Sequence, residues 1–287
     1  PLTGARAAAS DRGRGTGDNP GMATTPDWLG LADKLAVITG GAGGIGRACA
    51  IAFIEAGCGV ALLDHDEAAV TTLAAELSAS GARAFGIGCD IADEASVRAA
   101  ARAVQERIGT PDVLVNNAGI LRPGPLESLA LAEWNALLAV NLTGTLLCAQ
   151  AFGAMMRARK AGAIVHIASI AASNPQPRSG AYSASKAGVA MLSRQIALEW
   201  GPDGIRSNIV SPGLVRTPMS EAFYQAPGVA EARAALVPLR RIAGPGDIAD
   251  AVLFLASARA AYVTGAEILV DGGLDQIMME GVPRPGF

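Results

Sequence analysis

The sequence predicts a single α/β domain in which helices cover both faces of a parallel, doubly wound β-sheet. Short apolar runs alternate with stretches of helical periodicity from about residue 30 to about residue 273. Hydrophobic residues make up 51% of the 287 residues and aromatic residues only 4%, so the apolar content is mainly aliphatic. Such residues suit helices packed on a parallel sheet, and a chain of this length can bury a large core.

The individual elements follow one another regularly along the chain. The predicted strands cover residues 34–39, 59–63, 83–88, 112–115, 163–168, 205–210 and 267–270. One predicted helix ends near residue 57, and the others cover residues 66–80, 93–109, 130–160, 181–200 and 247–257. Strands that alternate with helices of this length form βαβ units, and right-handed crossovers place the helices on both faces. The pattern therefore predicts about seven parallel strands.

Residues 28–287 are expected to form this one domain, and residues 1–27 a flexible N-terminal extension. The first segment is rich in Gly, Ala and Arg and lacks apolar periodicity. The stretch 134–156 carries no charge and is long enough to cross a bilayer. Its Asn, Thr and Gln side chains would be costly in lipid, so we interpret it as a buried helix. We expect no membrane partner.

Charge and cysteine content exclude several other classes of protein. The net charge is −3 and no basic cluster is present, which argues against a nucleic-acid partner. There are two histidines, and no CxxC pair occurs among the four cysteines, so no metal site is expected. Buried thiols in a reducing cytoplasm are the simplest interpretation of Cys49, Cys58, Cys89 and Cys148.

A glycine-rich segment, Thr39 to Gly46, follows the first predicted strand and opens a helix. Its glycines allow the backbone to approach a pyrophosphate, and the helix N-terminus favours the negative charge. Asp64 closes the second predicted strand. Its carboxylate can accept hydrogen bonds from both adenosine ribose hydroxyls and would repel a 2′-phosphate, so NAD is expected rather than NADP. The alternatives for Asp64 are a solvated strand end or a helix cap.

A possible acid–base site lies further along the chain. Tyr182 and Lys186 are four residues apart and therefore share one helix face. A nearby ammonium can lower the pKa of a tyrosine, which could then exchange a proton with a substrate hydroxyl or carbonyl. Ser169 follows a predicted strand, at the sheet edge where ligands of such folds bind, although it could also be a turn serine. His166, inside that strand, is expected to be a packed core residue.

Together these motifs resemble the short-chain dehydrogenase/reductase family over about residues 31–273. The resemblance rests on TGGAGGIG at 39–46, Asp64, Asp90-Ile91, NNAG at 116–119, Asn141, Ser169, Tyr182-x-x-x-Lys186 and Pro212-Gly213 with Thr217. It implies a Rossmann-like sheet of seven strands and a catalytic tetrad of Asn141, Ser169, Tyr182 and Lys186. In that tetrad Tyr182 is the acid/base, Ser169 holds the substrate oxygen, and Lys186 tunes Tyr182 and binds the nicotinamide ribose. Asn141 would hold a water that links Lys186 to solvent.

The resemblance also implies a set of residues that contact the NAD cofactor. Asp90 would contact the adenine amine with Ile91 beside the ring, and Val215 and Thr217 would hold the carboxamide. Asn117 to Gly119 would stabilise the central strands and flank the adenosine side of the cofactor. The full set implied for NAD is Gly40, Gly44, Ile45, Gly46, Asp64, Asp90, Ile91, Asn117, Ala118, Gly119, Tyr182, Lys186, Pro212, Gly213, Val215 and Thr217.

The predicted function is an NAD-dependent oxidoreductase that interconverts a small secondary alcohol and its ketone. The alternatives are a 3-oxoacyl reductase or 3-hydroxyacyl dehydrogenase and, in another class, a regulator that binds NAD without turnover. We expect a cytoplasmic enzyme that forms a homotetramer or a homodimer. The substrate pocket is expected between residues 120–125, 170–179 and 214–240, with apolar walls from Leu121, Ile170, Met219, Phe223 and Tyr224. Arg122 and Arg178 are interpreted as solvated loop charges rather than as partners of an anionic group.

Overall fold

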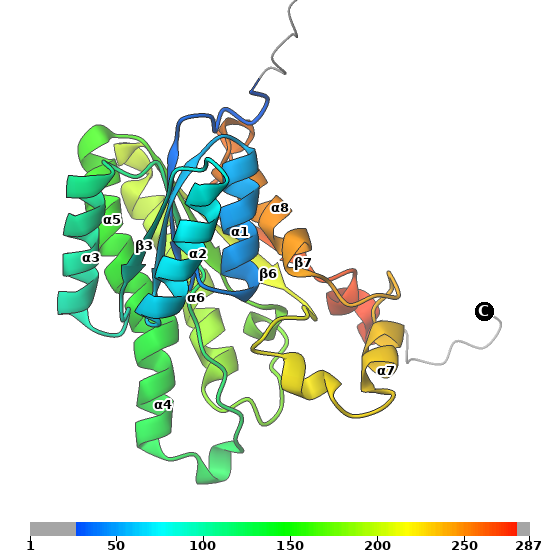
Figure 1. Cartoon of the computed structure of the whole chain (residues 1–287). Coiled ribbons are helices and arrows are strands. Elements are labelled where there is room, and N and C mark those ends of the chain that lie inside the picture. The colour runs from blue at the N-terminus through cyan, green and yellow to red at the C-terminus, as the bar shows by residue number, and fades with distance from the viewer. Residues whose placement is uncertain (1–26, 280–287) are drawn as a thin grey trace, which may run out of the picture.

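The computed structural model describes residues 27–279, and these form one parallel β-sheet flanked by helices (Figure 1). The strand order is β3-β2-β1-β4-β5-β6-β7, and every neighbouring pair is parallel. The strands are β1 (Leu35–Thr39), β2 (Gly59–Asp64), β3 (Ala84–Gly88), β4 (Val113–Asn116), β5 (Gly162–Ile167), β6 (Ile205–Pro212) and β7 (Glu267–Val270). The predicted doubly wound fold class is confirmed.

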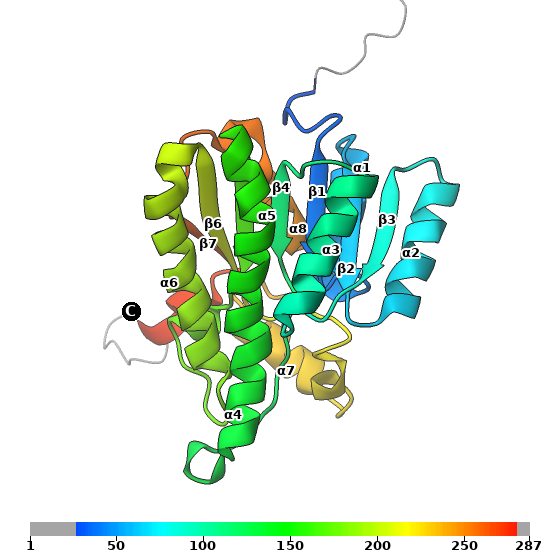
Figure 2. The same cartoon turned by 90° about the vertical axis from the view of Figure 1, so that its left-hand side faces the viewer.

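Helices cover both faces of this sheet. They are α1 (Gly44–Glu55), α2 (Glu67–Ala79), α3 (Glu94–Arg107), α4 (Leu131–Leu138), α5 (Thr145–Arg159), α6 (Tyr182–Trp200), α7 (Val229–Leu236) and α8 (Pro245–Ala256). Helices α1, α2 and α8 pack on one face of the sheet, which is seen nearly edge-on in Figure 1. Helices α3, α5 and α6 cover the other face (Figure 2). Helices α4 and α7 extend beyond the sheet at one end of the molecule (Figures 1 and 2).

Two hydrophobic cores lie between the sheet and its helix layers. Along β1, Ala36 and Ile38 pack toward α1 and α8, whereas Leu35 and Val37 pack toward α3 and α5. All four side chains are almost completely buried. Because both faces of a parallel sheet are covered, its strands are apolar at consecutive positions rather than at alternate ones. This explains why the strands are recognisable in the sequence as continuous apolar runs.

The order of the strands fixes where a ligand can bind. Strand β1 has β2 on one side and β4 on the other, so the winding of the chain reverses direction between β1 and β4. In open α/β sheets the crevice at this reversal, at the carboxyl ends of the strands, is the usual ligand site. The loops that follow β1, β2, β4, β5 and β6 therefore meet around one position.

The predicted helix over 130–160 differs from the structure in one respect. It consists of α4, a π-helical segment at Ala139–Gly144, and α5. A π-helical turn contains more residues than an α-helical turn, and such turns are frequent at functional sites. Here the segment contains the buried Asn141, whose main-chain oxygen accepts a hydrogen bond from the Thr145 hydroxyl at 2.8 Å. The apolar periodicity of the sequence gives no signal for this wider turn.

This same helical stretch, Leu131–Arg159, is long and apolar enough to cross a membrane when only length and composition are considered. In the fold its Phe152 and Met156 are fully buried in the core that also contains side chains of α3. The interpretation of this segment as a buried helix agrees with that packing.

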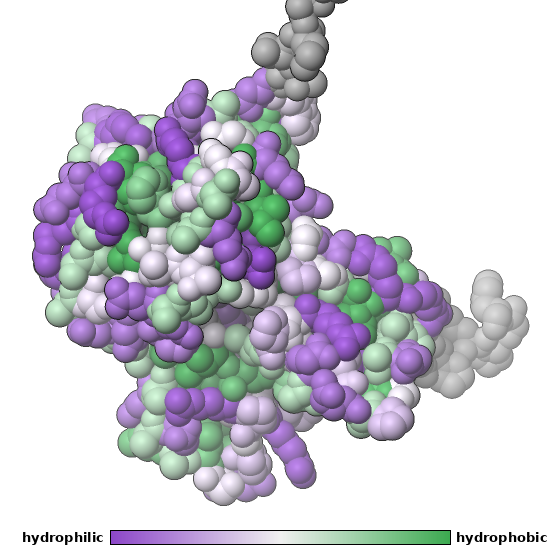
Figure 3. Space-filling view, viewed as in Figure 1, coloured by the Kyte–Doolittle hydropathy of each residue, from purple (hydrophilic) through white to green (hydrophobic). Residues whose placement is uncertain are grey.

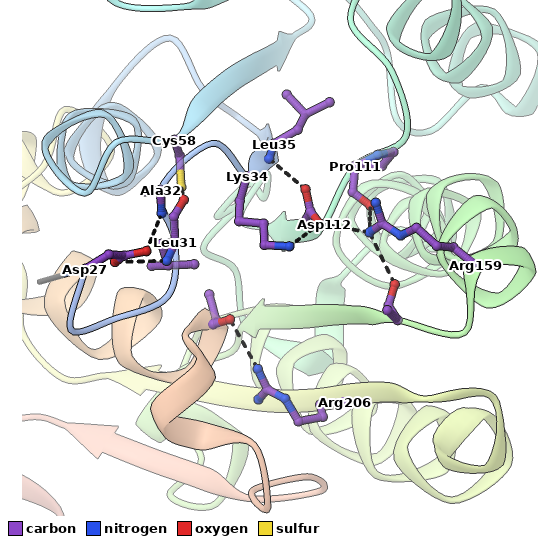
Figure 4. Close-up of polar contacts among 12 residues, drawn as sticks. Asp27, Leu31, Ala32, Lys34, Leu35, Cys58, Pro111, Asp112, Arg159 and Arg206 are labelled. Atoms are coloured by element: carbon purple, nitrogen blue, oxygen red, sulfur yellow. Dashed lines mark hydrogen bonds and ion pairs between the residues drawn. The ribbon is translucent and has the colours of Figure 1, made fainter.

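Charged side chains tie the amino ends of the strands together. The Asp112 carboxylate accepts a hydrogen bond from the Leu35 amide at 2.9 Å (Figure 4). It also forms ion pairs with Lys34 at 3.3 Å and with Arg159 at 3.0 Å. Through Asp112, the start of β4 is therefore joined to β1 and to the end of α5, at the opposite end of the sheet from the ligand crevice.

Arg206 holds the last turn of α8 against β6 (Figure 4). Its guanidinium donates hydrogen bonds to the carbonyl oxygens of Leu255 at 2.7 Å, Ala256 at 3.2 Å and Ser257 at 3.1 Å. The last carbonyls of a helix have no partner within that helix, and a cation is favourable beside them. Burial lowers the pKa of Arg206 from its usual value.

All four cysteines are free and buried, as expected. Burial raises the pKa of the Cys49 and Cys58 thiols to about 12 and that of Cys89 to about 11. A thiol with such a pKa is almost entirely protonated at neutral pH and is a poor nucleophile.

The predicted N-terminal extension 1–27 lies outside the described residues except for Asp27. The Asp27 carboxylate accepts hydrogen bonds from the amides of Gly30 at 2.8 Å and Ala32 at 2.9 Å. These bonds lower the pKa of Asp27. The division of the chain at residues 27 and 28 stays a prediction.

Candidate active site

A cavity of about 740 Å³ lies at the carboxyl ends of the central strands. Its volume falls within the range of about 300–1,000 Å³ that is common for small-molecule sites. Most of the residues predicted for the site line it: Gly40, Gly44, Ile45, Asp64, Asp90, Ile91, Asn117, Ala118, Gly119, Ser169, Tyr182, Lys186, Pro212, Gly213, Val215 and Thr217. The two exceptions, Gly46 and Asn141, lie behind the wall.

The glycine-rich turn after β1 brings bare backbone to the cavity. Gly40 has φ +64°, a conformation that favours glycine. A Cβ on Gly46 would lie 2.0 Å from the Gly40 carbonyl oxygen, so Gly46 allows α1 to pack against the turn. A Cβ on Gly43 would meet nothing within 4 Å. Among the described residues no side chain caps α1, so its first amides can donate to a pyrophosphate.

Asn117 and Thr39 fasten this turn to β4. The Asn117 Nδ2 donates hydrogen bonds to the carbonyl oxygens of Thr39 at 2.9 Å and Gly40 at 3.0 Å. The Thr39 hydroxyl accepts hydrogen bonds from the amides of Asn117 at 3.0 Å and Ala118 at 3.1 Å. These bonds agree with the stabilising role that the resemblance implies for this segment.

Asp64 ends β2 at the edge of the cavity, and its side chain is only 11% exposed. Its Oδ2 accepts a hydrogen bond from the Ala42 amide at 3.1 Å. Its Oδ1 accepts a hydrogen bond from the Asp66 amide at 3.2 Å and lies 2.9 Å from His65 Nδ1. The cap of α2 is Asp66, whose carboxylate accepts a hydrogen bond from the Ala69 amide. The helix-cap alternative for Asp64 therefore does not apply.

Tyr182 and Ser169 are neighbours in the cavity wall. Tyr182 begins α6, and Ser169 follows β5 at the start of a short 3₁₀ turn. Burial raises the pKa of the Tyr182 phenol, while a hydrogen bond with the Ser169 side chain acts in the opposite direction. The Ser169 Oγ also accepts a hydrogen bond from the Ala171 amide at 3.1 Å. Ser169 is thus both a turn serine and a polar neighbour of Tyr182.

Lys186 lies one helical turn beyond Tyr182 and is buried. Its Nζ donates a hydrogen bond to the Ile167 carbonyl oxygen at 2.8 Å and lies 5.7 Å from the centroid of the Tyr182 ring. Burial lowers the pKa of this ammonium to about 8. The sequence predicted that Lys186 lowers the Tyr182 pKa, but in this structure burial determines the direction of the shift for both groups.

Asn141 lies behind the cavity wall and holds the segment after β4 in place through hydrogen bonds. Its Oδ1 accepts a hydrogen bond from the Ile120 amide at 2.8 Å, and its Nδ2 donates to the Ile120 carbonyl at 3.0 Å and to Ser185 Oγ at 3.1 Å. A Cβ on Gly119 would lie 3.3 Å from Asn141 Oδ1 and 3.4 Å from Lys186 Nζ. Because Gly119 has no side chain, Asn141 Oδ1 and Lys186 Nζ can both come close to this backbone segment.

The other predicted cofactor residues occupy loops around the same cavity. The Asp90 Oδ1 accepts a hydrogen bond from the Ala92 amide at 2.9 Å, and Ile91 is 6% exposed. Val215 pairs with Ala243, which holds the loop after β6 in place. The amide of Thr217 donates to the Ser220 hydroxyl at 3.0 Å.

Comparisons with known proteins agree with this arrangement. A family model described as enoyl-(acyl carrier protein) reductase matches residues 40–275. The chain is 43% identical over 243 residues to D-threitol dehydrogenase of Mycolicibacterium smegmatis. The aligned region spans 85% of this chain and 93% of that protein. The chain belongs to the short-chain dehydrogenase/reductase family. As such it is an oxidoreductase.

Two solved structures of short-chain dehydrogenase/reductase type share the fold. One, a short-chain type dehydrogenase/reductase from Mycobacterium marinum, has a TM-score of 0.81 and 33% identity, over 86% of this chain and 98% of that one. A gluconate 5-dehydrogenase from Burkholderia cenocepacia in complex with NADP and tartrate has a TM-score of 0.83 and 35% identity, over 86% and 97% of the two chains.

The cavity of this short-chain dehydrogenase/reductase also includes residues that the sequence analysis did not select. Cys89, Val140, Ile167 and Ala168 line it. Their position beside the predicted Asp90, Asn141 and Ser169 is the only signal that could have indicated them. Of the predicted apolar walls, Leu121, Met219, Phe223 and Tyr224 line the cavity, whereas Ile170 is not among the lining residues within 27–279. Arg122 lines the cavity but forms an ion pair with Glu133 at 2.7 Å.

His166 lies in the core of this short-chain dehydrogenase/reductase, as expected. It is fully buried, and its Nδ1 lies 3.3 Å from Asn116 Nδ2. Its Nε2 and the Asn116 Oδ1 have no hydrogen-bond partner among the described residues. Burial, together with the charge of Lys186, lowers the pKa of His166 to about 3. The imidazole is therefore neutral at physiological pH.

The neutral state of His166 makes the stability of this protein sensitive to acid. Between about pH 6.5 and pH 3 the unfolded chain binds a proton on His166 that the folded chain does not bind, so the free energy of unfolding falls as the pH falls. At pH 5 the expected loss is about 2 kcal/mol, at about 1.4 kcal/mol for each pH unit below 6.5. Denaturant unfolding at pH 7 and pH 5 measures it.

His166→Asn should reduce this pH-dependent loss, whereas His65→Gln should not. His65 is the only other histidine and its side chain is 85% exposed. Equal pH dependence in the His166→Asn variant and the unmodified protein would contradict the assignment.

Proposed function

We propose that the protein is an NAD-dependent short-chain alcohol dehydrogenase or carbonyl reductase that interconverts a secondary alcohol and its ketone. The observation that carries this proposal is that Tyr182, Ser169 and Lys186 share one cavity with the glycine turn and Asp64. The activity of D-threitol dehydrogenase and gluconate 5-dehydrogenase on polyhydroxy compounds supports a secondary alcohol as the reacting group.

In the proposed reaction Ser169 and Tyr182 bind the substrate oxygen. In the oxidative direction the Tyr182 phenolate accepts the proton of the substrate hydroxyl while the adjacent carbon loses hydride, and the ketone forms. The hydride acceptor, nicotinamide C4, and a positive charge near the substrate are the chemistry that bound NAD⁺ would supply. Lys186, held by the Ile167 carbonyl, positions its ammonium beside the Tyr182 ring. In the reductive direction Tyr182 returns the proton.

The residues that would hold the cofactor fit its chemistry. The bare backbone at Gly43 and the uncapped start of α1 suit the pyrophosphate, and the largely buried carboxylate of Asp64 suits the adenosine ribose. A 2′-phosphate at that ribose would meet the Asp64 charge, and among the described residues no Lys or Arg forms an ion pair with Asp64. NADP in the related gluconate 5-dehydrogenase makes a direct comparison of the two cofactors necessary.

We expect catalytic efficiency with NAD to exceed that with NADP by at least about tenfold, equivalent to about 1.4 kcal/mol, because Asp64 repels the 2′-phosphate. Asp64→Ser should narrow this ratio. Steady-state rates with each cofactor measure it. Asp66→Ser is the matched control, since Asp66 is a neighbouring carboxylate that caps α2 and serine is also a good cap. Equal efficiency with both cofactors in the unmodified protein would refute the role of Asp64.

The alternatives are distinguished by turnover. An NAD-binding regulator would not need a proton carrier, whereas here Tyr182, Ser169 and Lys186 all lie in the cavity wall. The test is NADH formation with a panel of secondary alcohols, and NADH consumption with the matching ketones and with 3-oxoacyl thioesters. NADH binding without turnover of any of them would favour the regulator. A preference for the thioesters would favour the 3-oxoacyl reductase.

We also propose that the enzyme is cytoplasmic and forms a homotetramer or a homodimer. Support for assembly comes from α6, where the side chains of Met191 and Leu198 are 60% and 80% exposed. A groove between α5 and α6 lies beside them and is lined partly by Leu146 and Leu192. Support for the cytoplasm comes from the four reduced, buried cysteines.

A further inference from the structure

The segment after β6 places an arginine in the cavity wall. This segment includes a 3₁₀ turn at Glu221–Tyr224 and helix α7, which projects from the body of the molecule (Figure 1). Arg233, on α7, is half-buried and lines the same cavity as Tyr182. Its guanidinium carbon lies 5.3 Å from the centroid of the Phe223 ring and 5.1 Å from that of the Tyr224 ring.

Arg233 differs from the other arginines nearby in its electrostatic partners. Arg216, which stacks on Tyr224 at 5.5 Å, is paired with Glu221 through two hydrogen bonds of 2.7 and 3.0 Å. Arg122, on the other side of the cavity, is paired with Glu133 at 2.7 Å. Among residues 27–279, no carboxylate lies within ion-pair distance of Arg233 and no side-chain hydrogen bond involves it.

This arrangement leaves the donors of Arg233 available to a ligand. When a planar guanidinium stacks on aromatic rings, its N–H groups still point outward in its own plane. There they can donate hydrogen bonds to both oxygens of a carboxylate. Contacts with two rings also restrict the Arg233 side chain before a ligand binds. The side chain therefore loses less conformational freedom on binding. The cavity that contains Arg233 and Tyr182 is also lined by apolar side chains, including Leu121, Met219 and Phe223. Figure 3, which has the same view as Figure 1, shows hydrophobic surface below the centre of the molecule, with hydrophilic surface beside it on the side of α7.

We propose that Arg233 binds the carboxylate of the substrate, so that the substrate is a hydroxycarboxylate. Its secondary hydroxyl lies at Tyr182 and Ser169, and its carboxylate pairs with the guanidinium of Arg233. The apolar side chains of the cavity wall contact the carbon skeleton. This inference rests on the proposed dehydrogenase activity and adds the chemical class of the substrate to it.

The test compares acids with their uncharged counterparts. A series of hydroxycarboxylates that differ in the number of carbons between hydroxyl and carboxylate is assayed with NAD, each beside its primary amide. The unmodified enzyme should prefer at least one acid over its amide by about tenfold or more in kcat/KM. Arg233→Met, which keeps an unbranched side chain but removes the charged guanidinium, should lower kcat/KM for that acid by about tenfold, mainly through KM.

The controls separate charge recognition from packing. Arg233→Lys should recover part of the preference for the acid, and the KM for NAD should stay unchanged in all variants. Arg216→Met removes a second arginine that stacks on Tyr224 and should leave the ratio of acid to amide unchanged. If Arg233→Met lowers acid and amide equally, Arg233 only supports the wall and the inference is wrong.

A binding measurement makes the test independent of turnover. Carboxylates of the same series without the hydroxyl are titrated calorimetrically into the enzyme–NADH complex, where the unmodified protein should bind at least one of them about tenfold more tightly than Arg233→Met does. Turnover of neutral alcohols without binding or turnover of any acid would overturn the inference and leave the proposed dehydrogenase intact. Binding of acids without turnover of any alcohol or ketone would instead count against the dehydrogenase.

Discussion

Replacement of Tyr182 by phenylalanine should lower kcat by roughly 100-fold or more, because it removes the hydroxyl that exchanges a proton with the substrate. The ring remains, so the packing at the start of α6 is retained. The hydrogen bond between Tyr182 and Ser169 is lost, but the glycine turn and Asp64 are unaffected. NADH binding, followed by fluorescence titration, should therefore stay close to that of the unmodified enzyme.

The matched control for this substitution is Tyr224→Phe. Tyr224 lines the same cavity and loses the same oxygen atom, but it lies on the segment after β6, where Arg216 and Arg233 stack on its ring. Its replacement should leave kcat within a few-fold of the unmodified value. If the Tyr182→Phe variant retained most of its turnover, proton transfer by Tyr182 would be ruled out.

The fold could be predicted closely because its signal is repeated along the chain. Each buried parallel strand is apolar on both faces, as in β1 from Leu35 to Thr39, and therefore appears as an uninterrupted apolar run. The π-helical segment that contains Asn141 could not be predicted in this way. It depends on contacts with Ile120, which is distant in the sequence, and an apolar periodicity reports only on local packing.

The candidate site could be predicted as a set of positions but not as an electrostatic environment. Motif spacing located Tyr182, Ser169 and Lys186, and strand ends located Asp64. The direction of the Tyr182 pKa shift follows from how completely the folded protein removes water from the phenol, which no spacing expresses. Arg233 was predicted only as part of a long wall segment, because its lack of a carboxylate partner becomes visible only when the neighbouring arginines are seen with theirs.

Replacement of Lys186 by methionine should affect both chemistry and cofactor binding. The substitution keeps a similar length but removes the ammonium that lies 5.7 Å from the Tyr182 ring and donates to the Ile167 carbonyl. Burial already raises the pKa of Tyr182, and loss of a nearby positive charge raises it further, typically by one unit or more. Less phenolate is then present at neutral pH, about tenfold less for each unit of pKa, and kcat for alcohol oxidation should fall by roughly tenfold or more.

The pH profile distinguishes this effect from a loss of structure. Lys186 is charged below its pKa of about 8, so in the unmodified enzyme the ammonium supports the phenolate through neutral pH. In the variant, the acidic limb of the profile for alcohol oxidation should move to higher pH by about one unit or more. NADH should bind more weakly if Lys186 makes the ribose contact that the family resemblance implies. Lys34→Met, at the opposite end of the sheet, should change neither quantity. An unshifted acidic limb in Lys186→Met would show that its ammonium does not act on Tyr182, even if turnover were lost.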